Sequence, residues 1–145
     1  MKWTDIAIQD LKRYEGLKRS VQAINERLEV LEMQKSLISS MNTENVMVQC
    51  TPTSIDDRLI DNIVQRERLS MNLEINQRLI ILIERGLTAL NDTEKRVLDL
   101  FYISRRKNHV DTLMTELCYE QAMVYKIKDQ ALYNFTINMF GIPEY

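Results

Sequence analysis

A group of basic and amide side chains in the last third of the sequence has the chemistry to contact DNA. Glutamine can make a bidentate contact to adenine, and lysine can contact guanine or a phosphate. Consecutive cations in a polar loop can contact phosphates beside a base-reading helix. The candidate DNA-binding residues are Gln121, Ala122, Tyr125, Lys126, Lys128, Arg105, Arg106 and Lys107. For all of them the alternative is an ordinary solvated surface, and Tyr125 could instead pack on its own domain.

Three short helices are expected to position these residues. Asn91 followed by Glu94 at the third helical position is typical of a helix start. The sequence then predicts a helix over 94–102, a basic loop over 104–108, a helix over 110–117, a turn at 118–119 and a helix over 120–139. The inward face predicted for the last helix is Val124, Ile127, Ala131, Leu132 and Phe135. Two helices joined by a tight turn behind a supporting helix form a helix-turn-helix, whose last helix fits a major groove.

The first 89 residues predict two long helices, over 4–40 and 54–89, joined by a loop over 39–54. The seam predicted for the first helix is Tyr14, Leu17, Val21, Ile24, Leu28, Leu31 and Ile38, interrupted by Lys35. The seam predicted for the second is Leu59, Ile63, Leu69, Leu73, Ile80, Ile83, Leu87 and Leu90. Ser54 with Asp57 resembles a capping box. These heptad-like stripes can pair within one chain, as an antiparallel hairpin, or between two copies.

The composition favours an all-α protein. The 145 residues include three glycines and two prolines, where an average chain would hold roughly 17 of the two together. No apolar run is long enough to cross a bilayer, and the N-terminus lacks the apolar stretch of a secretory signal. Cys50 and Cys118 fit a reducing compartment. We therefore expect a cytoplasmic protein that does not enter a membrane.

Patterns for catalysis are missing from the sequence. It has no GxxxxGK[ST] phosphate loop, no GxGxxG turn and no GxSxG elbow. His109, the single histidine, and the two separated cysteines cannot form a closed structural zinc site without carboxylates. We interpret His109 as a residue at the start of a helix. The sequence thus predicts a protein that is not an enzyme and uses no metal or cofactor.

The charge of the C-terminal module bears on how it would bind DNA. The basic residues from Leu90 onward are Lys95, Arg96, Arg105, Arg106, Lys107, Lys126 and Lys128. The acidic residues are Asp92, Glu94, Asp99, Asp111, Glu116, Glu120, Asp129 and Glu144. A monomer with about 3–5 phosphate contacts should bind weakly at physiological salt. Either a homodimer through the N-terminal helices or RNA polymerase would strengthen the binding.

A family resemblance rests on residues of this same region. The residues are Leu90-Asn91, Glu94 to Leu98, Phe101-Tyr102, Leu113, Glu116 to Glu120, Val124 to Ile127 and Ala131-Leu132. In this order they resemble the fourth region of bacterial sigma factors, which reads the upstream promoter element and touches the RNA polymerase flap. With the ending Asn138 to Gly141, the whole chain is similar to ArpU/RinA-type phage transcriptional regulators, which are implicated in switching on late genes.

The resemblance implies a division into a helical hairpin over 1–89, for oligomerisation or as a scaffold, and a sigma region 4-like domain over 90–145. It implies a sequence-specific regulator of phage or prophage late genes that binds double-stranded DNA with host RNA polymerase, in the bacterial cytoplasm. Two alternatives stay open: a helical adaptor that does not read DNA, and a DNA-packaging subunit like the small terminase.

Two residues depart from the sigma pattern. Cys118 stands where glycine is usual, so the turn must either avoid a left-handed conformation or tolerate strain. Glu120 stands where serine or threonine would cap the last helix, and glutamate caps poorly.

Overall fold

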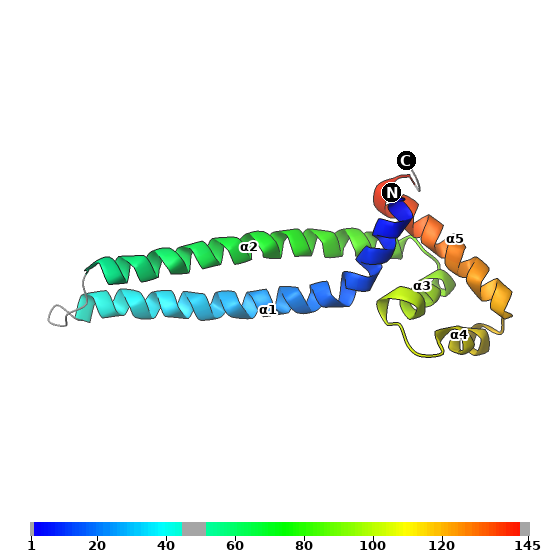
Figure 1. Cartoon of the computed structure of the whole chain (residues 1–145), viewed down its shortest axis with the longest axis horizontal. Coiled ribbons are helices and arrows are strands. Elements are labelled where there is room, and N and C mark those ends of the chain that lie inside the picture. The colour runs from blue at the N-terminus through cyan, green and yellow to red at the C-terminus, as the bar shows by residue number, and fades with distance from the viewer. Residues whose placement is uncertain (1, 45–51, 143–145) are drawn as a thin grey trace. The chain divides into compact units, whose positions relative to one another are not determined.

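Helices make up most of the part of the chain that the structure describes. The computed structural model describes residues 2–44 and 52–142, without the side chains of 41–44 and 52–54. Its elements in order are α1 (Trp3–Glu44), α2 (Pro52–Thr88), α3 (Asp92–Leu98), a π-helical turn (Asp99–Ile103), α4 (His109–Leu117) and α5 (Gln121–Phe140). The predicted all-α fold is confirmed: a long antiparallel pair of helices, α1 and α2, is followed by shorter packed helices (Figure 1).

The long helices extend further into the predicted loop than expected. α1 continues to Glu44, and α2 already begins at Pro52 rather than at Ser54. Proline is well suited to the first turn of a helix, because its fixed φ is helical and its missing N–H would have no partner there. The capping box predicted at Ser54 is therefore wrong. The rest of the predicted loop lies outside the described residues.

The chain forms two compact units, and one of them is built from two segments that are far apart in the sequence. The core unit consists of Met1–Lys18 with Arg78–Tyr145, and the hairpin unit consists of Arg19–Gln77.

In the hairpin unit, the seam predicted for α2 is wrong at Ile63, which is 44% exposed. The alternation by three and four that starts at Leu59 falls instead on Asn62 and Arg66. Asn62 is buried, and its side-chain nitrogen donates to the main-chain oxygen of Leu31 on α1 at 2.8 Å. The polar seam position is therefore satisfied by a bond between the two helices.

Two further polar contacts join α1 to α2 in this unit. The Arg66 guanidinium donates to the oxygen of Asn62 at 2.8 Å and pairs with the Glu32 carboxylate at 3.1 Å. Nearer the other end of the unit, the Asn76 amide donates to the Ser20 hydroxyl at 3.0 Å. Hydrogen bonds of this kind can form in only one register of the two helices, so they disfavour other registers.

The core unit has a tightly packed interior. Its first cluster of buried residues is Ala7, Leu11, Tyr14, Ile83, Leu90, Leu98, Ala131, Leu132 and Phe135. Gly86 permits a close approach of α2 to α5, because a Cβ there would lie 2.8 Å from Phe135 Cε2. The Tyr14 hydroxyl donates to the Glu84 carboxylate at 2.7 Å, which ties the start of α1 to the end of α2. This cluster anchors α5, the helix that carries most of the candidate DNA-binding residues.

Candidate nucleic-acid interface

A second apolar cluster holds α3, the π-helical turn, α4 and α5 together. Its buried members are Val97, Leu100, Phe101, Leu113, Val124 and Ile127, with Val110, Met114 and Leu117 packed against them. Every residue predicted for the inward face of α5 is buried, so that prediction is confirmed. The apolar residues of three short helices thus meet in one small core, as a helix-turn-helix requires.

The start of α3 is fixed by a cap and by a contact to α5. The Asn91 side chain accepts a hydrogen bond from the Glu94 main-chain N–H at 2.8 Å, as predicted for an N-cap. The Glu94 carboxylate does not close a capping box. It is buried and accepts from the Asn134 amide of α5 at 3.0 Å. This link between α3 and α5 was not predicted, because nothing in the sequence pairs residues so far apart.

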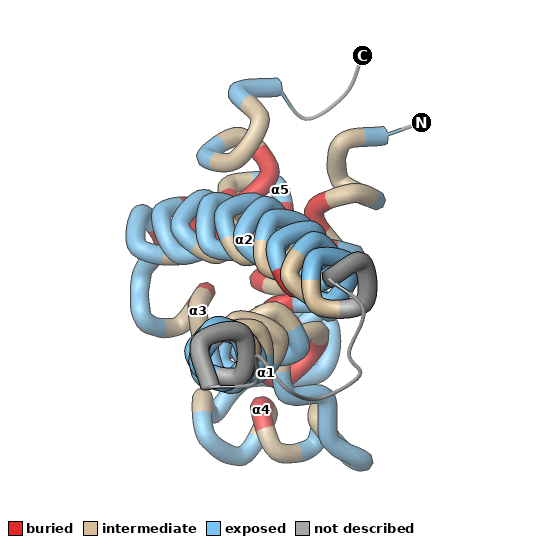
Figure 2. Tube along the Cα trace, turned by 90° about the vertical axis from the view of Figure 1, so that its left-hand side faces the viewer, coloured by how far each residue is buried: buried red, intermediate tan, exposed pale blue. Residues whose placement is uncertain are grey.

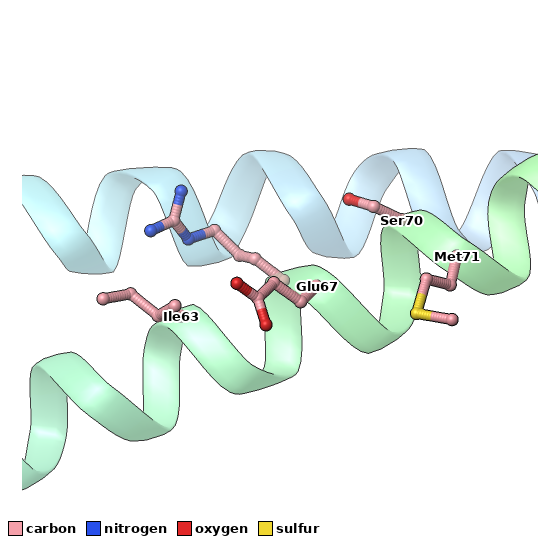
Figure 3. Close-up of a pocket in the computed structure, with 5 residues that line it drawn as sticks. Ile63, Glu67, Ser70 and Met71 are labelled. Carbon is pink, nitrogen blue, oxygen red and sulfur yellow. The ribbon is translucent and has the colours of Figure 1, made fainter.

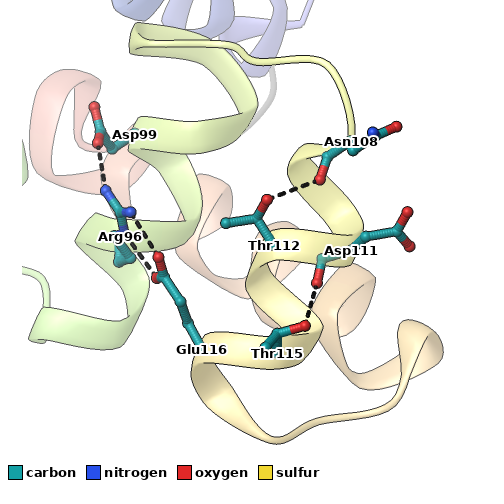
Figure 4. A network of polar contacts seen from close by, with 7 residues as sticks. All are labelled: Arg96, Asp99, Asn108, Asp111, Thr112, Thr115 and Glu116. Carbon is teal, nitrogen blue, oxygen red and sulfur yellow. Dashed lines mark hydrogen bonds and ion pairs between the residues drawn. The ribbon is translucent and has the colours of Figure 1, made fainter.

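An ion pair joins α3 to α4 (Figure 4). The Arg96 guanidinium donates to both oxygens of Glu116, at 2.9 and 2.8 Å, and also reaches Asp99 at 3.3 Å. The hydrogen bond from Arg96 lowers the pKa of the Glu116 carboxyl below its ordinary value, and the same bond raises the pKa of Arg96. Arg96 is therefore committed to holding α4 and is not a candidate for phosphate contact.

The turn between α4 and α5 adopts a left-handed conformation. Cys118 has φ 57° and ψ 39°, a region that residues other than glycine visit at a cost. The sequence predicts that this turn either avoids a left-handed conformation or tolerates strain, and the structure shows the strained, left-handed turn. The Cys118 thiol lies 3.9 Å from the Thr115 main-chain oxygen and is exposed. The surrounding packing of α4 and α5 must therefore hold this turn in place.

The first two turns of α5 present the predicted base-contacting residues to solvent. Gln121, Ala122, Tyr125 and Lys126 are all exposed. Tyr125 and Lys126 follow Gln121 and Ala122 after one helical turn, so the four residues share the face of α5 opposite Val124 and Ile127. Glu120 precedes the helix in an extended conformation, and its side chain makes no capping hydrogen bond. The main-chain N–H groups of the first turn therefore lack a side-chain partner from the cap residue.

An aromatic chain links the base-contacting face to the basic loop. The Phe101 ring makes edge contacts with Tyr125, at 5.8 Å between centroids, and with His109, at 4.6 Å. His109 is the first residue of α4, as predicted, and its Nδ1 lies 3.2 Å from the Arg106 main-chain oxygen. Phe101 thus fixes the start of α4 and the exposed face of α5 relative to each other.

Lys128 is less accessible to a DNA phosphate than predicted. Its ammonium nitrogen lies 2.7 Å from an Asp129 oxygen and within 6 Å of the centres of the Phe101 and Tyr125 rings. Burial alone would lower the pKa of Lys128, but the hydrogen bond to Asp129 and the nearby Tyr102 raise it above its ordinary value. Lys128 therefore stays charged while its carboxylate neighbour offsets part of the field it could offer to a phosphate.

The basic loop is open to solvent. Arg105, Arg106 and Lys107 are exposed, and within the described ranges none of them forms an ion pair. Together with Asn108 and His109 they line a shallow hollow of about 370 Å³. Asn108 ends the loop with φ 60°, a left-handed conformation that asparagine tolerates well. The three cations thus remain available to an anionic partner.

No protein-family model, curated protein or solved structure matches the chain. In the described part of the chain, no helix is long and apolar enough to cross a membrane.

Proposed function

We propose that the chain is a sequence-specific DNA-binding transcriptional regulator in which α5 enters the major groove. The observation that carries the proposal is the exposed face of Gln121, Ala122, Tyr125 and Lys126 at the start of a helix whose opposite face is buried. A major groove admits such a helix, and glutamine and lysine can read base edges within it.

The distribution of charge supports this proposal. Of the seven basic residues after Leu90, Arg96 is paired with Glu116, and Lys128 is paired with Asp129. The other five, which are Lys95, Lys126 and the three cations of the basic loop, form no ion pair within the described residues. The loop would position the module on phosphates, and Lys126 would contact a base or a phosphate.

Glu120 has a part in the same proposal. Its carboxylate stands at the N-terminus of α5, where it would repel a phosphate or accept from a cytosine amino group. The sequence selectivity of the protein would then come from Glu120 and Gln121 together, and the affinity from the cations.

We further propose that the protein acts with host RNA polymerase on late genes of a phage or prophage. This step rests on the resemblance to sigma region 4 and to ArpU/RinA-type regulators. It also explains how a module of low net charge could bind its site. A polymerase that holds the module at a promoter would supply affinity that a few phosphate contacts cannot supply alone.

A helical adaptor is the second candidate, and one observation favours it. A hollow of about 230 Å³ lies beside α5, on a face other than the proposed groove-reading one. Its lining includes the half-exposed Tyr119 and Met123, with Asn91 and Glu94 at the start of α3. Aromatic and methionine side chains of this kind are common in protein–protein contacts.

The proposal is tested by capturing sheared genomic DNA from the source organism on the full chain at two salt concentrations and sequencing the bound fragments. We expect one discrete site to be enriched, and enrichment to fall at the higher salt as counterions compete. The double variant Gln121→Ala/Lys126→Ala should lose that site. The matched control Gln9→Ala/Lys12→Ala changes the same residue types at exposed positions of α1 and should retain it.

Two results would overturn the proposal. One is an absence of enrichment with the unmodified chain at both salt concentrations, which would favour the adaptor and make RNA polymerase the next bait. The other is an unchanged enriched site in the Gln121→Ala/Lys126→Ala variant, which would mean that another surface binds DNA.

A further inference from the structure

Ala122 and Tyr125 form an apolar pair in the middle of the exposed face of α5. At about 100° per residue the two lie about 60° apart around the helix axis, with Gln121 on one side of the pair and Lys126 on the other. Residues three apart on a helix are neighbours on its surface. Both members of the pair are exposed. The centre of the proposed base-contacting face is therefore apolar, and its hydrogen-bonding groups flank that centre.

The Tyr125 ring is held by two neighbours within the core unit. The buried Phe101 ring meets it edge-on, with 5.8 Å between the centroids and 74° between the ring planes. The Lys128 ammonium lies 5.7 Å from the centroid of the Tyr125 ring, which is a cation–π contact. Tyr125 nevertheless stays 40% exposed. The exposed part of the ring therefore has a defined position on α5.

Ala122 limits what the centre of this face can recognise. Its side chain is a single methyl group, which neither donates nor accepts a hydrogen bond. A residue of this size lets the helix come close to the floor of a major groove, where it can recognise only an apolar group. Among the base edges that line the major groove, that apolar group is the 5-methyl of thymine.

The pair on α5 differs from the apolar side chains that α2 exposes. Figure 3 shows Ile63, Glu67 and Met71 on α2, around a shallow hollow of about 480 Å³. Met71 is 65% exposed there. Methionine is unbranched and adapts its shape to many surfaces. The Tyr125 ring, in contrast, is held by Phe101 and Lys128, so it suits a contact of defined geometry.

We infer that Ala122 and Tyr125 together bind the 5-methyl group of one thymine in the DNA site. The inference rests on the proposed function, in which α5 enters the major groove, and it adds a requirement for a T·A base pair. The methyl group lies between the Ala122 side chain and the exposed part of the Tyr125 ring. Gln121 and Lys126 make their hydrogen bonds on either side of it. Ala122 and Tyr125 are thus specificity-determining residues that act without hydrogen bonds to the base.

The test removes the methyl group and leaves the base pairing unchanged. The full chain first selects a duplex from a pool of random sequences. That duplex is then prepared again with each thymine in turn replaced by deoxyuridine, which pairs in the same way but lacks the 5-methyl. Fluorescence anisotropy measures the affinity for each duplex. At one position we expect the affinity to fall about fourfold, the worth of one buried methyl group.

Four variants assign that methyl group to the pair. Tyr125→Ala and Ala122→Gly should each bring the ratio of thymine to uracil affinity at this position close to one. Tyr125→Phe keeps the ring and should keep the ratio. Met123→Ala is the matched control and should also keep it, because Met123 is likewise 40% exposed on α5 but lines the hollow on another side of the helix. Each variant is compared with itself on two duplexes, so a general loss of stability or affinity cancels.

Two results would overturn this inference alone. One is a selected duplex in which no thymine responds to loss of its methyl group, which would assign the apolar pair to contact with a protein. The other is a responsive thymine whose affinity ratio is unchanged in both Tyr125→Ala and Ala122→Gly, which would place the methyl contact elsewhere. If the chain selects no duplex at all, the proposed DNA-binding function fails, and the inference fails with it.

Discussion

The two compact units differ in how completely they bury their side chains. In the core unit, Leu98, Leu113, Val124 and Phe135 are fully buried. In the hairpin unit, only Leu31 and Asn62 are buried among the described residues, and most of α2 is exposed (Figure 2). Two helices side by side can cover only one stripe each, whereas helices that meet from several directions enclose a core. The core unit can therefore hold a site rigidly, while the hairpin unit leaves surface for a partner.

The largest expected effect comes from truncating a core residue. Phe135→Ala should lower the free energy of unfolding by about 3–5 kcal/mol, since it removes a fully buried ring and leaves a cavity. Leu73→Ala in the half-buried seam of the hairpin unit should cost only about 1–2 kcal/mol. Urea unfolding followed by circular dichroism measures both. Equal losses would contradict the contrast between the units.

Replacing each of the two helical glycines by alanine should change the free energy of unfolding in opposite directions. Gly86→Ala should destabilise the protein by about 1–3 kcal/mol, because its Cβ would collide with Phe135. Gly16 lies in α1 with nothing near the site of a Cβ, so Gly16→Ala should stabilise the protein by about 0.5–1 kcal/mol. Thermal unfolding of the two variants checks the pair. A stabilised Gly86→Ala variant would mean that α2 and α5 are not closely packed.

A better cap on α5 should give a smaller gain. Glu120 is already extended, with φ −73° and ψ 160°, and serine in that conformation can accept from the main-chain N–H groups of the first turn. Glu120→Ser should therefore raise the free energy of unfolding by about 0.5–1 kcal/mol. Urea unfolding measures this gain. If Glu120 is a base-reading residue, the same variant should also change DNA selectivity, and an unchanged selectivity would remove Glu120 from the site.

The smallest effect concerns the pH dependence of stability. Because the folded pKa of Glu116 is lowered, its ion pair with Arg96 contributes stability above the unfolded pKa, ordinarily 4.5. This contribution is lost as the pH falls through the lowered folded pKa. Glu116→Gln should therefore be less stable than the unmodified chain at neutral pH and approach it in acid. Urea midpoints measured from pH 7 down to pH 3 give the comparison, and a constant difference across that range would contradict it.

The sequence was sufficient for the features that depend on apolar spacing. The inward face of α5, from Val124 to Phe135, is a helical repeat of apolar residues, and burying that stripe determines the packing. The N-cap at Asn91 was equally predictable, because it depends on neighbouring residues alone.

Features that depend on tertiary contacts were not predictable. Apolar spacing predicts Ile63 in the seam of α2, but Asn62 takes that place because its amide donates to the Leu31 main-chain oxygen. The position of Lys128 near the rings of Phe101 and Tyr125, with Asp129 as its ion-pair partner, is a contact of the same tertiary kind. The left-handed Cys118 is a third case, in which packing overrides a local preference.

The central claim is that the exposed face of α5 reads bases, and one titration tests it most directly. Fluorescence anisotropy compares the affinity for an enriched genomic fragment with that for a shuffled fragment of the same composition. Gln121→Ala should reduce the ratio of these affinities about 5- to 150-fold, the worth of one bidentate base contact, and should leave the salt dependence unchanged. An unchanged ratio, or an equal loss of affinity on both fragments, would contradict the claim that this helix reads the sequence.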